Sequence, residues 1–360
     1  MKIGIVTIND YNNYGNRLQN YAVQEILESL NNDVTTLINY PVYNFKKKFF
    51  LRRFRYYNYK TQENYSFNTL RKEAFIEFNR NINFSTKLHT IKSCYNYDYL
   101  VVGSDQVWNP NFGRLSDLDL LCIKNVKKVA LSASFGISEL PQDINKSFLK
   151  LSLEDFKAIS VREESGKNIL SYVIPGKEVE VLIDPTMIVN VKIWDKISKR
   201  PKMLKSGKFI LNYFLGELSS VRKKEIERIA KENDCIVINL LDINDIFYEC
   251  GPSEFLYLEK NAFLICTDSF HSSVFAILFN RPFIIFNRNQ DGVVNMSSRL
   301  DTLIHTFKLE NRYYNEVGIT KENLYCDYTE AHEILTLKRL EAMTFIKKSF
   351  QNKDEETISE

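Results

Sequence analysis

The feature that most constrains the fold is the regular alternation of short, β-rich apolar runs with segments of helical periodicity. The chain begins with such a run over Lys2–Ile8, and another follows over Val34–Asn39. Asn16 lies between them and is expected to cap a helix. Apolar residues then recur at the 3.6-residue spacing of a helix that packs on a sheet: Leu18, Tyr21, Ala22, Ile26 and Leu30. This segment predicts one strand–helix–strand unit with parallel strands.

The alternation continues along the chain in two blocks. In the first block we expect further strands at four apolar runs: Tyr99–Gly103, Lys128–Ser134, Ala158–Arg162 and Val179–Asp184. In the second block we expect four more: Phe209–Leu215, Cys235–Leu241, Phe263–Thr267 and Phe283–Phe286. The basic stretch Asn190–Lys208 breaks the pattern between the blocks. The sequence therefore predicts an α/β protein with two Rossmann-like, doubly wound parallel sheets that face each other across a cleft.

The two blocks give the expected domain boundaries. Residues 1–190 form the first predicted domain, 209–330 form the second, and 191–208 form an irregular hinge. A helix over 331–352 is expected to pack against one of the two domains, and an acidic tail over 353–360 follows it. A chain of 360 residues, 44% of them hydrophobic, is long enough for two such cores.

Doubly wound sheets bind ligands at the carboxyl ends of their strands, so we expect the functional residues in the loops that follow the strands. No G-x-G-x-x-G sequence follows the first strand, and no Walker A sequence occurs. Both absences disfavour a nicotinamide cofactor and P-loop chemistry. The six cysteines include no C-x-x-C pair and have no neighbouring histidine, so we expect no metal site.

The segment Phe263–Phe279 joins an apolar strand to a helix that is expected to open at or next to His271. Thr267, Ser269 and Ser272 lie around this junction. A helix N-terminus carries unpaired N–H groups and a partial positive charge, which hold anions and favour a neutral imidazole. An N-terminal capping cluster beside a histidine that is packed for structural reasons fits the same spacing equally well.

Arg162 closes the predicted strand that begins at Ala158, and Glu163 and Glu164 follow it. A guanidinium at a strand end can bind a carboxylate or a phosphate with two parallel hydrogen bonds. The alternative is a salt bridge to Glu163, Glu164 or another nearby acid.

The loop Gly103–Asn109 follows the most hydrophobic strand of the first block. Asp105, Gln106 and Asn109 carry groups that hydrogen-bond sugar hydroxyls, and Trp108 offers a face for a sugar ring. An ordinary turn with a capping aspartate would have nearly the same sequence.

Several of these segments together resemble the polysaccharide pyruvyl transferase family over nearly the whole chain. The matching pieces occur in order: DYNNYGNRLQNYAVQ, VVGSDQVWN, SASFG, SVREESG, IDPTMI, NYFLGE, TDSFHSSVFAILFNRPF and SSRLDTL. The resemblance implies a fold like that of GT-B glycosyltransferases, with the acceptor on the N-terminal side of the cleft and the donor on the C-terminal side. It also implies transfer of the pyruvyl group of phosphoenolpyruvate to a saccharide, which forms a pyruvate ketal and releases phosphate.

The resemblance also implies roles for individual residues. His271 corresponds to the active-site histidine, Arg162 to a donor-binding arginine, and Ser269–Ser272 to the loop that holds donor oxyanions. Asp105 is the candidate that orients or deprotonates the acceptor. We predict three sets of site residues: catalytic His271 and Asp105; donor-binding Arg162, Thr267, Ser269, Phe270, Ser272 and Arg299; acceptor-binding Asn16, Gln106, Trp108 and Asn109.

The chain departs from the family at one position. Many relatives carry Arg-Leu-His where this chain has Ser269, Phe270 and His271, so one donor-binding arginine is missing. Arg299 could replace it, as could two other arginines of this region: Arg281 and Arg288. The loss is also compatible with weaker donor binding or with a different donor.

Two other functions remain open at this stage. One is a glycosyltransferase that uses a nucleotide sugar on the same architecture, and the other is a saccharide-binding relative without catalytic activity. For the pyruvyl transferase, phosphoenolpyruvate is a co-substrate, and no further cofactor is expected.

The segment Tyr43–Lys60 is a basic and aromatic insertion in the first predicted domain. It holds seven of the 48 Lys and Arg residues and eight aromatic rings, and it has no acid. Basic residues interleaved with rings bind anionic membrane surfaces or nucleic acid. No nucleic-acid motif accompanies them, so we expect no nucleic acid and favour contact with an anionic membrane that carries a lipid-linked acceptor. The alternative is an arm whose rings pack on the domain and whose charges are solvated.

The sequence predicts a cytoplasmic protein, with peripheral contact at the inner face of the membrane. The apolar start Met1–Ile8 is interrupted by Asn9, Asp10 and Asn12 before it reaches the length of a secretory signal. The other apolar runs are far shorter than the ~18 residues of a membrane span.

Overall fold

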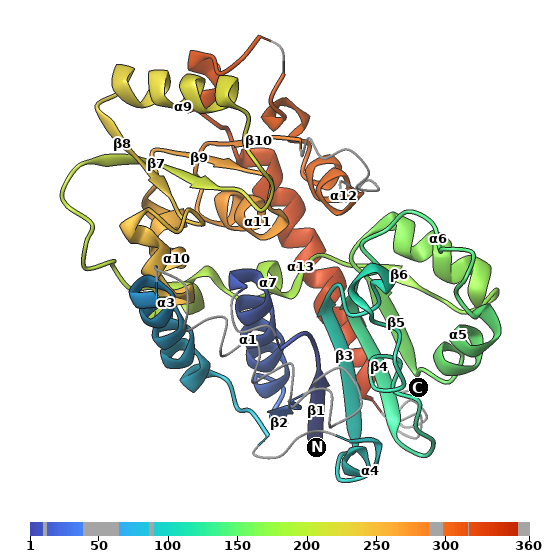
Figure 1. The fold of residues 1–360 in the computed structure, drawn as a ribbon. Coiled ribbons are helices and arrows are strands. Elements are labelled where there is room, and N and C mark those ends of the chain that lie inside the picture. Colours follow the sequence, from blue (N-terminus) through green and yellow to red (C-terminus); the bar gives the residue numbers. More distant parts are fainter. Residues whose placement is uncertain (10–12, 39–64, 86–89, 288–297, 316, 352–360) are drawn as a thin grey trace.

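The computed structural model describes residues 1–9, 13–38, 65–85, 90–287, 298–315 and 317–351 (Figure 1). The basic insertion Tyr43–Lys60, Arg288 and the acidic tail 353–360 lie outside the described residues. The membrane contact predicted for the insertion therefore stays a prediction.

The first sheet has six parallel strands in the order β2-β1-β3-β4-β5-β6. Its central strands are buried on both faces, as their continuous apolar runs predict. The strands are β1 (Lys2–Val6), β2 (Asp33–Thr36), β3 (Tyr99–Asp105), β4 (Lys127–Ala133), β5 (Ala158–Val161) and β6 (Glu180–Val181).

The second sheet has four parallel strands in the order β10-β9-β7-β8. They are β7 (Lys208–Tyr213), β8 (Cys235–Asn239), β9 (Leu264–Thr267) and β10 (Phe283–Ile285). The strand order reverses between β1 and β3 in the first sheet and between β7 and β9 in the second, as in doubly wound folds. The two-sheet α/β class predicted from the alternation is confirmed.

Helices connect the strands and cover the sheets. The first block contains α1 (Tyr14–Glu28), α3 (Tyr65–Phe78), α4 (Ile91–Cys94), α5 (Lys146–Leu153) and α6 (Glu164–Val173). The rest of the chain contains α7 (Pro185–Ile188), α8 (Val191–Ile197), α9 (Ser220–Glu232), α10 (Pro252–Asn261), α11 (Phe270–Leu278), α12 (Ser298–Thr306) and α13 (Thr329–Phe350). Figure 1 shows the two sheets one above the other, with α7 and α10 between them.

Helix α1 lies in the interface between the two blocks. Its first residue, Tyr14, stacks between Phe75 of α3 and Phe255 of α10, with ring centroids 5.2 and 4.7 Å away. Because both blocks contact the helix, its polar side chains are buried together with its apolar stripe. The predicted cap is wrong: Asn13, not Asn16, is the N-cap, because the Asn13 side chain accepts a hydrogen bond from the backbone N–H of Asn16.

The stretch 191–208, expected to be an irregular hinge, begins with the helix α8, so the irregular conformation predicted for its first part is wrong, and its role as a hinge stays a prediction. Asn190 caps the helix, and Trp194 is fully buried at its centre. The Trp194 ring contacts Tyr21 of α1 and Phe275 of α11, with centroids 5.9 and 5.2 Å away. One hydrophobic core therefore continues from the first block through α8 into the second.

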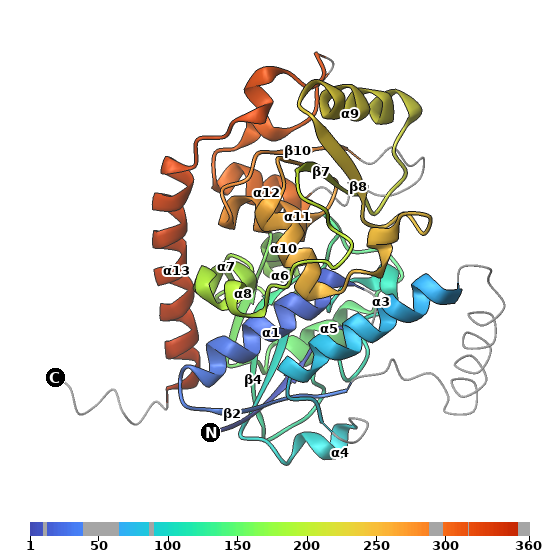
Figure 2. The same cartoon turned by 90° about the vertical axis from the view of Figure 1, so that its left-hand side faces the viewer.

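Helix α13 spans both blocks, whereas the sequence predicted packing against one of them (Figure 2). Near its start, the Tyr328 hydroxyl donates to the Arg281 carbonyl of the second block. Near its end, Phe350 packs on Tyr99 of β3 with ring centroids 5.0 Å apart. Within the described ranges, no helix is both long enough and apolar enough to cross a membrane.

The middle of α13 is tied by Arg339 to α7 and to the residue that follows it, and this contact gives a stability prediction. Its Nε donates to the Met187 carbonyl at 2.6 Å, and its Nη2 donates to the Val189 carbonyl at 3.1 Å. Arg339→Ala leaves both carbonyls without this donor, so we expect the free energy of unfolding to fall by about 2 kcal/mol in urea denaturation. The control Lys347→Ala, at an exposed position of the same helix, should change it by less than about 0.5 kcal/mol. Equal effects of the two variants would contradict the assignment.

Candidate functional site

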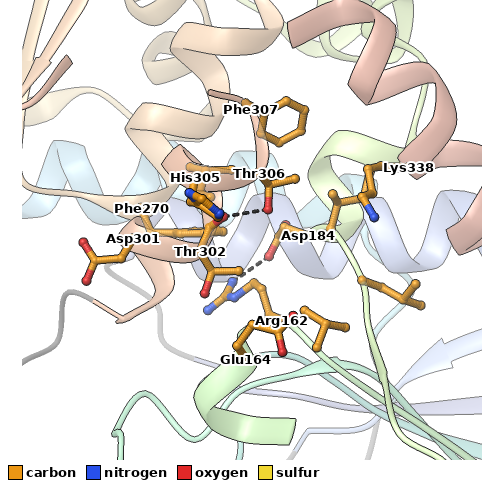
Figure 3. Close-up of a pocket in the computed structure, with 14 residues that line it drawn as sticks. Arg162, Glu164, Asp184, Phe270, Asp301, Thr302, His305, Thr306, Phe307 and Lys338 are labelled. Atoms are coloured by element: carbon orange, nitrogen blue, oxygen red, sulfur yellow. Dashed lines mark hydrogen bonds and ion pairs between the residues drawn. The ribbon is translucent and has the colours of Figure 1, made fainter. Parts of the chain in front are cut away.

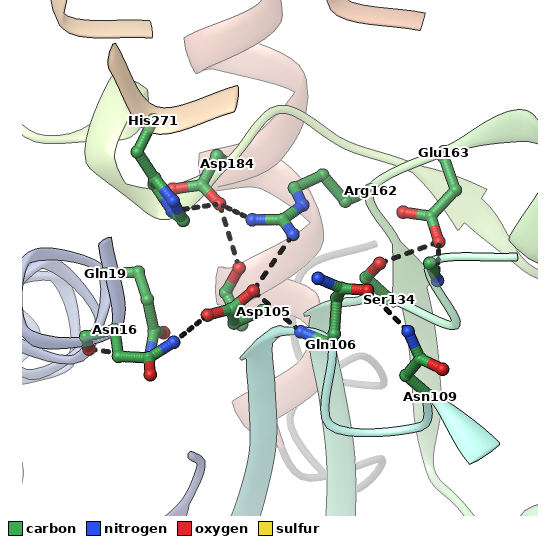
Figure 4. A network of polar contacts seen from close by, with 12 residues as sticks. Asn16, Gln19, Asp105, Gln106, Asn109, Ser134, Arg162, Glu163, Asp184 and His271 are labelled. Carbon is green, nitrogen blue, oxygen red and sulfur yellow. Dashed lines mark hydrogen bonds and ion pairs between the residues drawn. The ribbon is translucent and has the colours of Figure 1, made fainter. Parts of the chain in front are cut away.

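The carboxyl ends of the strands bring a cluster of polar side chains together between the two sheets (Figure 4). Asp105 ends β3, Arg162 follows β5, and Asp184 lies just before α7. His271 enters from the first turn of α11 in the second block, and Asn16 enters from the first turn of α1. Each of these side chains belongs to a residue that is at most 7% exposed. Four of the five belong to the predicted set, and Asp184 is an addition.

Arg162 binds two carboxylates. Its Nη1 is 2.6 Å from Oδ2 of Asp184, and its Nη2 is 3.3 Å from Oδ1 of Asp105. The Phe270 ring covers the guanidinium, with its centroid 4.3 Å from Cζ. The structure therefore corresponds to the salt-bridge alternative, although the partners are not the adjacent glutamates. Glu163 instead accepts hydrogen bonds from the 134–136 loop.

Asp184 is the functional candidate that sequence reasoning missed. Its Oδ1 accepts from the N–H and hydroxyl of Thr186, and its Oδ2 accepts from the Ser104 hydroxyl and from Arg162. Burial alone would raise the pKa of this carboxyl, but Arg162, His271 and Thr186 lower it to about 2. The Asp-Pro-Thr sequence signals only a helix cap with proline at its first position, and this local role hides the carboxylate's second one.

His271 is neutral at neutral pH. Burial lowers its pKa below the ordinary value; Asp184 and Asp105 oppose this shift, and Arg162 and Arg299 add to it. Its Nε2 is 3.8 Å from Oδ2 of Asp184. The imidazole can therefore accept a proton and would be stabilised by a carboxylate once it is charged.

Asp105 stays ionised although it is buried. Burial raises its pKa, but Arg162, His271, Arg299 and the backbone N–H of Gln106 outweigh it, and the net shift is downward. The N–H of Gln106 lies 2.8 Å from Oδ1, and the Asn16 amide donates to Oδ2. Asn16, predicted to bind the acceptor, holds Asp105 in this structure.

Arg299 from α12 reaches the cluster, as the sequence analysis suggested for one of three arginines. Its Nη atoms are 3.1 and 3.2 Å from the amide of Gln106 when the amide oxygen faces them. Its charge also lowers the pKa of both Asp105 and His271. Arg281 precedes β10 and therefore lies at the amino end of the second sheet, away from the cluster.

Two predicted ligand-binding side chains have other partners. Trp108, predicted as a face for a sugar, is fully buried; it packs on Phe135 and Phe156, and its Nε1 donates to the Asp119 carbonyl. The sugar-stacking role is therefore wrong for this structure, because the ring fills the core of the first block. The Ser272 hydroxyl donates to Glu259 of α10 at 2.6 Å, away from the His271 cluster.

The remaining predicted polar residues support the loops around the cluster. Asn109 caps a short turn and lies 2.6 Å from the Gln106 amide. The Thr267 hydroxyl donates to the Tyr213 carbonyl and accepts from the Ser269 N–H, which places Ser269 at the N-cap of α11. The start of α11 is thus held to β7, with its first N–H groups unused within the helix.

Gly15 determines how closely α1 approaches His271, and this contact is testable. A Cβ on Gly15 would lie 2.1 Å from Nδ1 of His271. We therefore expect Gly15→Ala to lower the free energy of unfolding by about 1–3 kcal/mol through overpacking, measured by urea denaturation. Gly166→Ala is the matched control: a Cβ there meets Val161 at an ordinary 3.4 Å, and the change should stabilise the helix by about 0.5–1 kcal/mol. Two variants of equal stability would contradict the close contact.

The lowered pKa of His271 predicts a pH dependence. The folded protein binds the imidazole proton more weakly than the unfolded chain, so the free energy of unfolding should fall as the pH drops below about 6.5. His271→Gln should remove this part of the slope, at most about 1.4 kcal/mol per pH unit. In NMR, the His271 ring signal, assigned by its loss in the variant, should titrate below about 6.5. A midpoint at or above that pH would contradict the neutral imidazole.

The solved structures that align with this chain have low sequence identity to it and low TM-scores. A UDP-GlcNAc 2-epimerase from Neisseria meningitidis, solved with UDP-GlcNAc, aligns with a TM-score of 0.45 and 12% identity over 95% of this chain and 100% of its own. MurG from Acinetobacter baumannii aligns with a TM-score of 0.40 and 10% identity over 95% and 94%. Likenesses this weak carry no argument about the substrate. Among curated proteins, none matches the chain significantly.

A protein-family profile matches the sequence more clearly than any of these structures does. The profile of the polysaccharide pyruvyl transferase family matches residues 13–290, which is more than half of the chain. The matched region contains the ends of β3, β5 and β9 and the helix start that carries His271. This chain belongs to the polysaccharide pyruvyl transferase family.

Proposed function

We propose that the protein transfers the pyruvyl group of phosphoenolpyruvate to a saccharide and releases phosphate. The observation that carries the proposal is a neutral, buried His271 held beside the Asp184 carboxylate, within a family of pyruvyl transferases. In such a reaction a sugar hydroxyl oxygen bonds to C2 of the donor while the methylene carbon gains a proton. The C2–O bond to phosphate then breaks, and a second hydroxyl of the sugar closes the ketal at C2.

His271 is the acid–base group in this proposal. Its neutral imidazole can take the proton of the attacking hydroxyl, and the imidazolium that forms faces Asp184 at 3.8 Å. The charged ring can then supply a proton to the methylene carbon or to the departing phosphate. Asp105 is a weaker base because its pKa is lowered and its oxygens are occupied, so we assign it to orientation rather than to proton removal.

The donor carries a carboxylate and a phosphate, so its site needs cationic or N–H groups close to His271. Arg162 already balances Asp105 and Asp184, so we assign it mainly to holding these carboxylates. Arg299 and the first N–H groups of α11 are the better candidates for the donor's carboxylate and phosphate, because both lie at the cluster. In this proposal Arg299 replaces the family arginine whose position is occupied by Ser269.

The test is phosphate release from phosphoenolpyruvate by the purified protein, with and without a panel of saccharide acceptors. We expect release only with an acceptor, and His271→Ala should lower kcat by about 10²–10⁴-fold because it removes the acid–base group. His332→Ala is the control, because His332 lies on α13 and contacts Asn280 outside the cluster.

Two results would contradict the proposal. Wild-type turnover by His271→Ala would remove the assigned role of the histidine. Release of a nucleoside diphosphate from a sugar nucleotide, without phosphate release from phosphoenolpyruvate, would show a glycosyltransferase instead.

A further inference from the structure

A pocket of about 350 Å³ opens between the two blocks beside the buried ion pair (Figure 3). Its walls come from the start of α6, from α12 and from α13, and its floor includes Arg162, Asp184 and Phe270. Small-molecule sites have volumes of roughly 300–1,000 Å³, so the pocket is large enough to bind a ligand. The side chains predicted to bind the acceptor are not among those that line it.

The charges around the pocket do not favour an anionic ligand. Arg162 is paired with Asp184, and Lys338 is paired with Glu341 at 2.7 Å. Two further carboxylates, Glu164 and Asp301, line the pocket without a cation partner among the described residues. Because negative charge is in excess, phosphoenolpyruvate is repelled here and an uncharged ligand is favoured.

The polar groups of the wall are mostly hydrogen-bond acceptors. The hydroxyl of Thr302 donates to the Ser298 carbonyl at 2.8 Å, and the hydroxyl of Thr306 donates to the Thr302 carbonyl at 2.7 Å. Both oxygens therefore keep lone pairs for an incoming donor, and the carboxylates of Glu164 and Asp301 offer more. A ligand that presents several O–H donors matches this set.

Apolar groups complete the wall. Phe270, Leu303 and Phe307 line the pocket together with the residues that follow β6. A pyranose ring combines hydroxyl donors at its rim with an apolar C–H face, so it complements both kinds of surface. The Phe270 ring lies against His271, with ring centroids 5.3 Å apart, and Asp184 in the floor is the carboxylate that faces His271. A sugar ring that contacts Phe270 and Asp184 would thus contact two neighbours of the proposed acid–base group, although His271 itself does not line the pocket.

We propose that this pocket is the acceptor subsite and that it receives an uncharged sugar ring. The proposal rests on the proposed function. It moves the acceptor from the loop Gly103–Asn109, whose polar side chains are engaged in the buried network, to the space between α6, α12 and α13.

The test measures binding to the full-length protein. The probes are methyl glycosides of glucose, galactose and mannose and of their 2-acetamido forms, observed by saturation-transfer NMR at millimolar concentration. At least one should bind the wild type. Thr306 lies on α12 two turns after Arg299, and Thr306→Trp places a large ring in the pocket, so this variant should abolish binding of the glycoside. Glu164→Gln replaces a charged hydrogen-bond-accepting carboxylate by a neutral amide of the same shape, and it should weaken binding of the glycoside by about tenfold. The matched control is Thr336→Trp, at an exposed position of α13 that does not line the pocket, and it should bind like the wild type.

Calorimetry with phosphoenolpyruvate on the same proteins separates this proposal from the proposed function. We expect all three variants to bind phosphoenolpyruvate like the wild type. If phosphoenolpyruvate fails to bind but the glycosides bind and respond to the variants, the proposed function fails and the subsite stands.

Three outcomes would overturn the subsite. In one, no glycoside binds the wild type. In another, the glycosides bind Thr306→Trp or Glu164→Gln as tightly as the wild type. In the third, phosphoenolpyruvate gains affinity in Glu164→Gln, as an anion in this pocket would when a neighbouring negative charge is removed, while the affinity of the glycosides does not change.

Discussion

The buried guanidinium of Arg162 is the interaction on which the centre of the molecule depends. It neutralises two carboxylates, one at the end of β3 and one at the start of α7, and without it Asp105 and Asp184 would repel each other in a medium of low dielectric constant. Removing one partner of a buried pair typically costs about 3–5 kcal/mol, because the other charge stays buried. The same pair keeps both aspartates ionised, and these two charges partly offset the effect of burial on the pKa of His271. The protonation state of His271 therefore depends on the same Arg162 that holds the two aspartates in place.

The second block contributes His271, the proposed acid–base group, and the first block contributes the charges around it. His271 lies on α11, whose start is tied to β7 through Thr267. Its counter-charges are Asp105 at the end of β3 and Asp184 at the start of α7. The proposed reaction therefore requires that both halves keep a constant relative position at the level of single hydrogen bonds. Gly15 contributes to this position, because it lets the backbone of α1 approach the imidazole.

Local patterning predicted the strands well, because a buried parallel strand leaves a continuous apolar run, and every predicted strand is present. It failed where the partners of a side chain lie far from it along the chain. In the sequence, Trp108 looks like an exposed residue of an irregular loop. The side chains that it packs against, Phe135 and Phe156, lie far along the chain, so its burial is not evident from the local sequence. In the sequence, Asp184 looks like a plain helix cap, because the arginine that binds its second oxygen lies 22 residues away along the chain. The sequence thus indicated His271, Arg162 and Asp105 as site candidates and left a salt bridge open for Arg162, but the two carboxylates that bind it are recognisable only in the folded chain.

The continuous core across α8, together with α13, has a consequence for protein engineering. Domain exchange between relatives assumes that each half brings its own complete interior. Here Trp194 lies between helices of both blocks, and α13 ends against β3 after starting beside the second sheet. A chimera that joins the second block of this protein to the first block of a relative would create mismatched cavities along that seam. Functional hybrids would therefore require the surface of α1 and the whole of α13 to be inherited from the same parent.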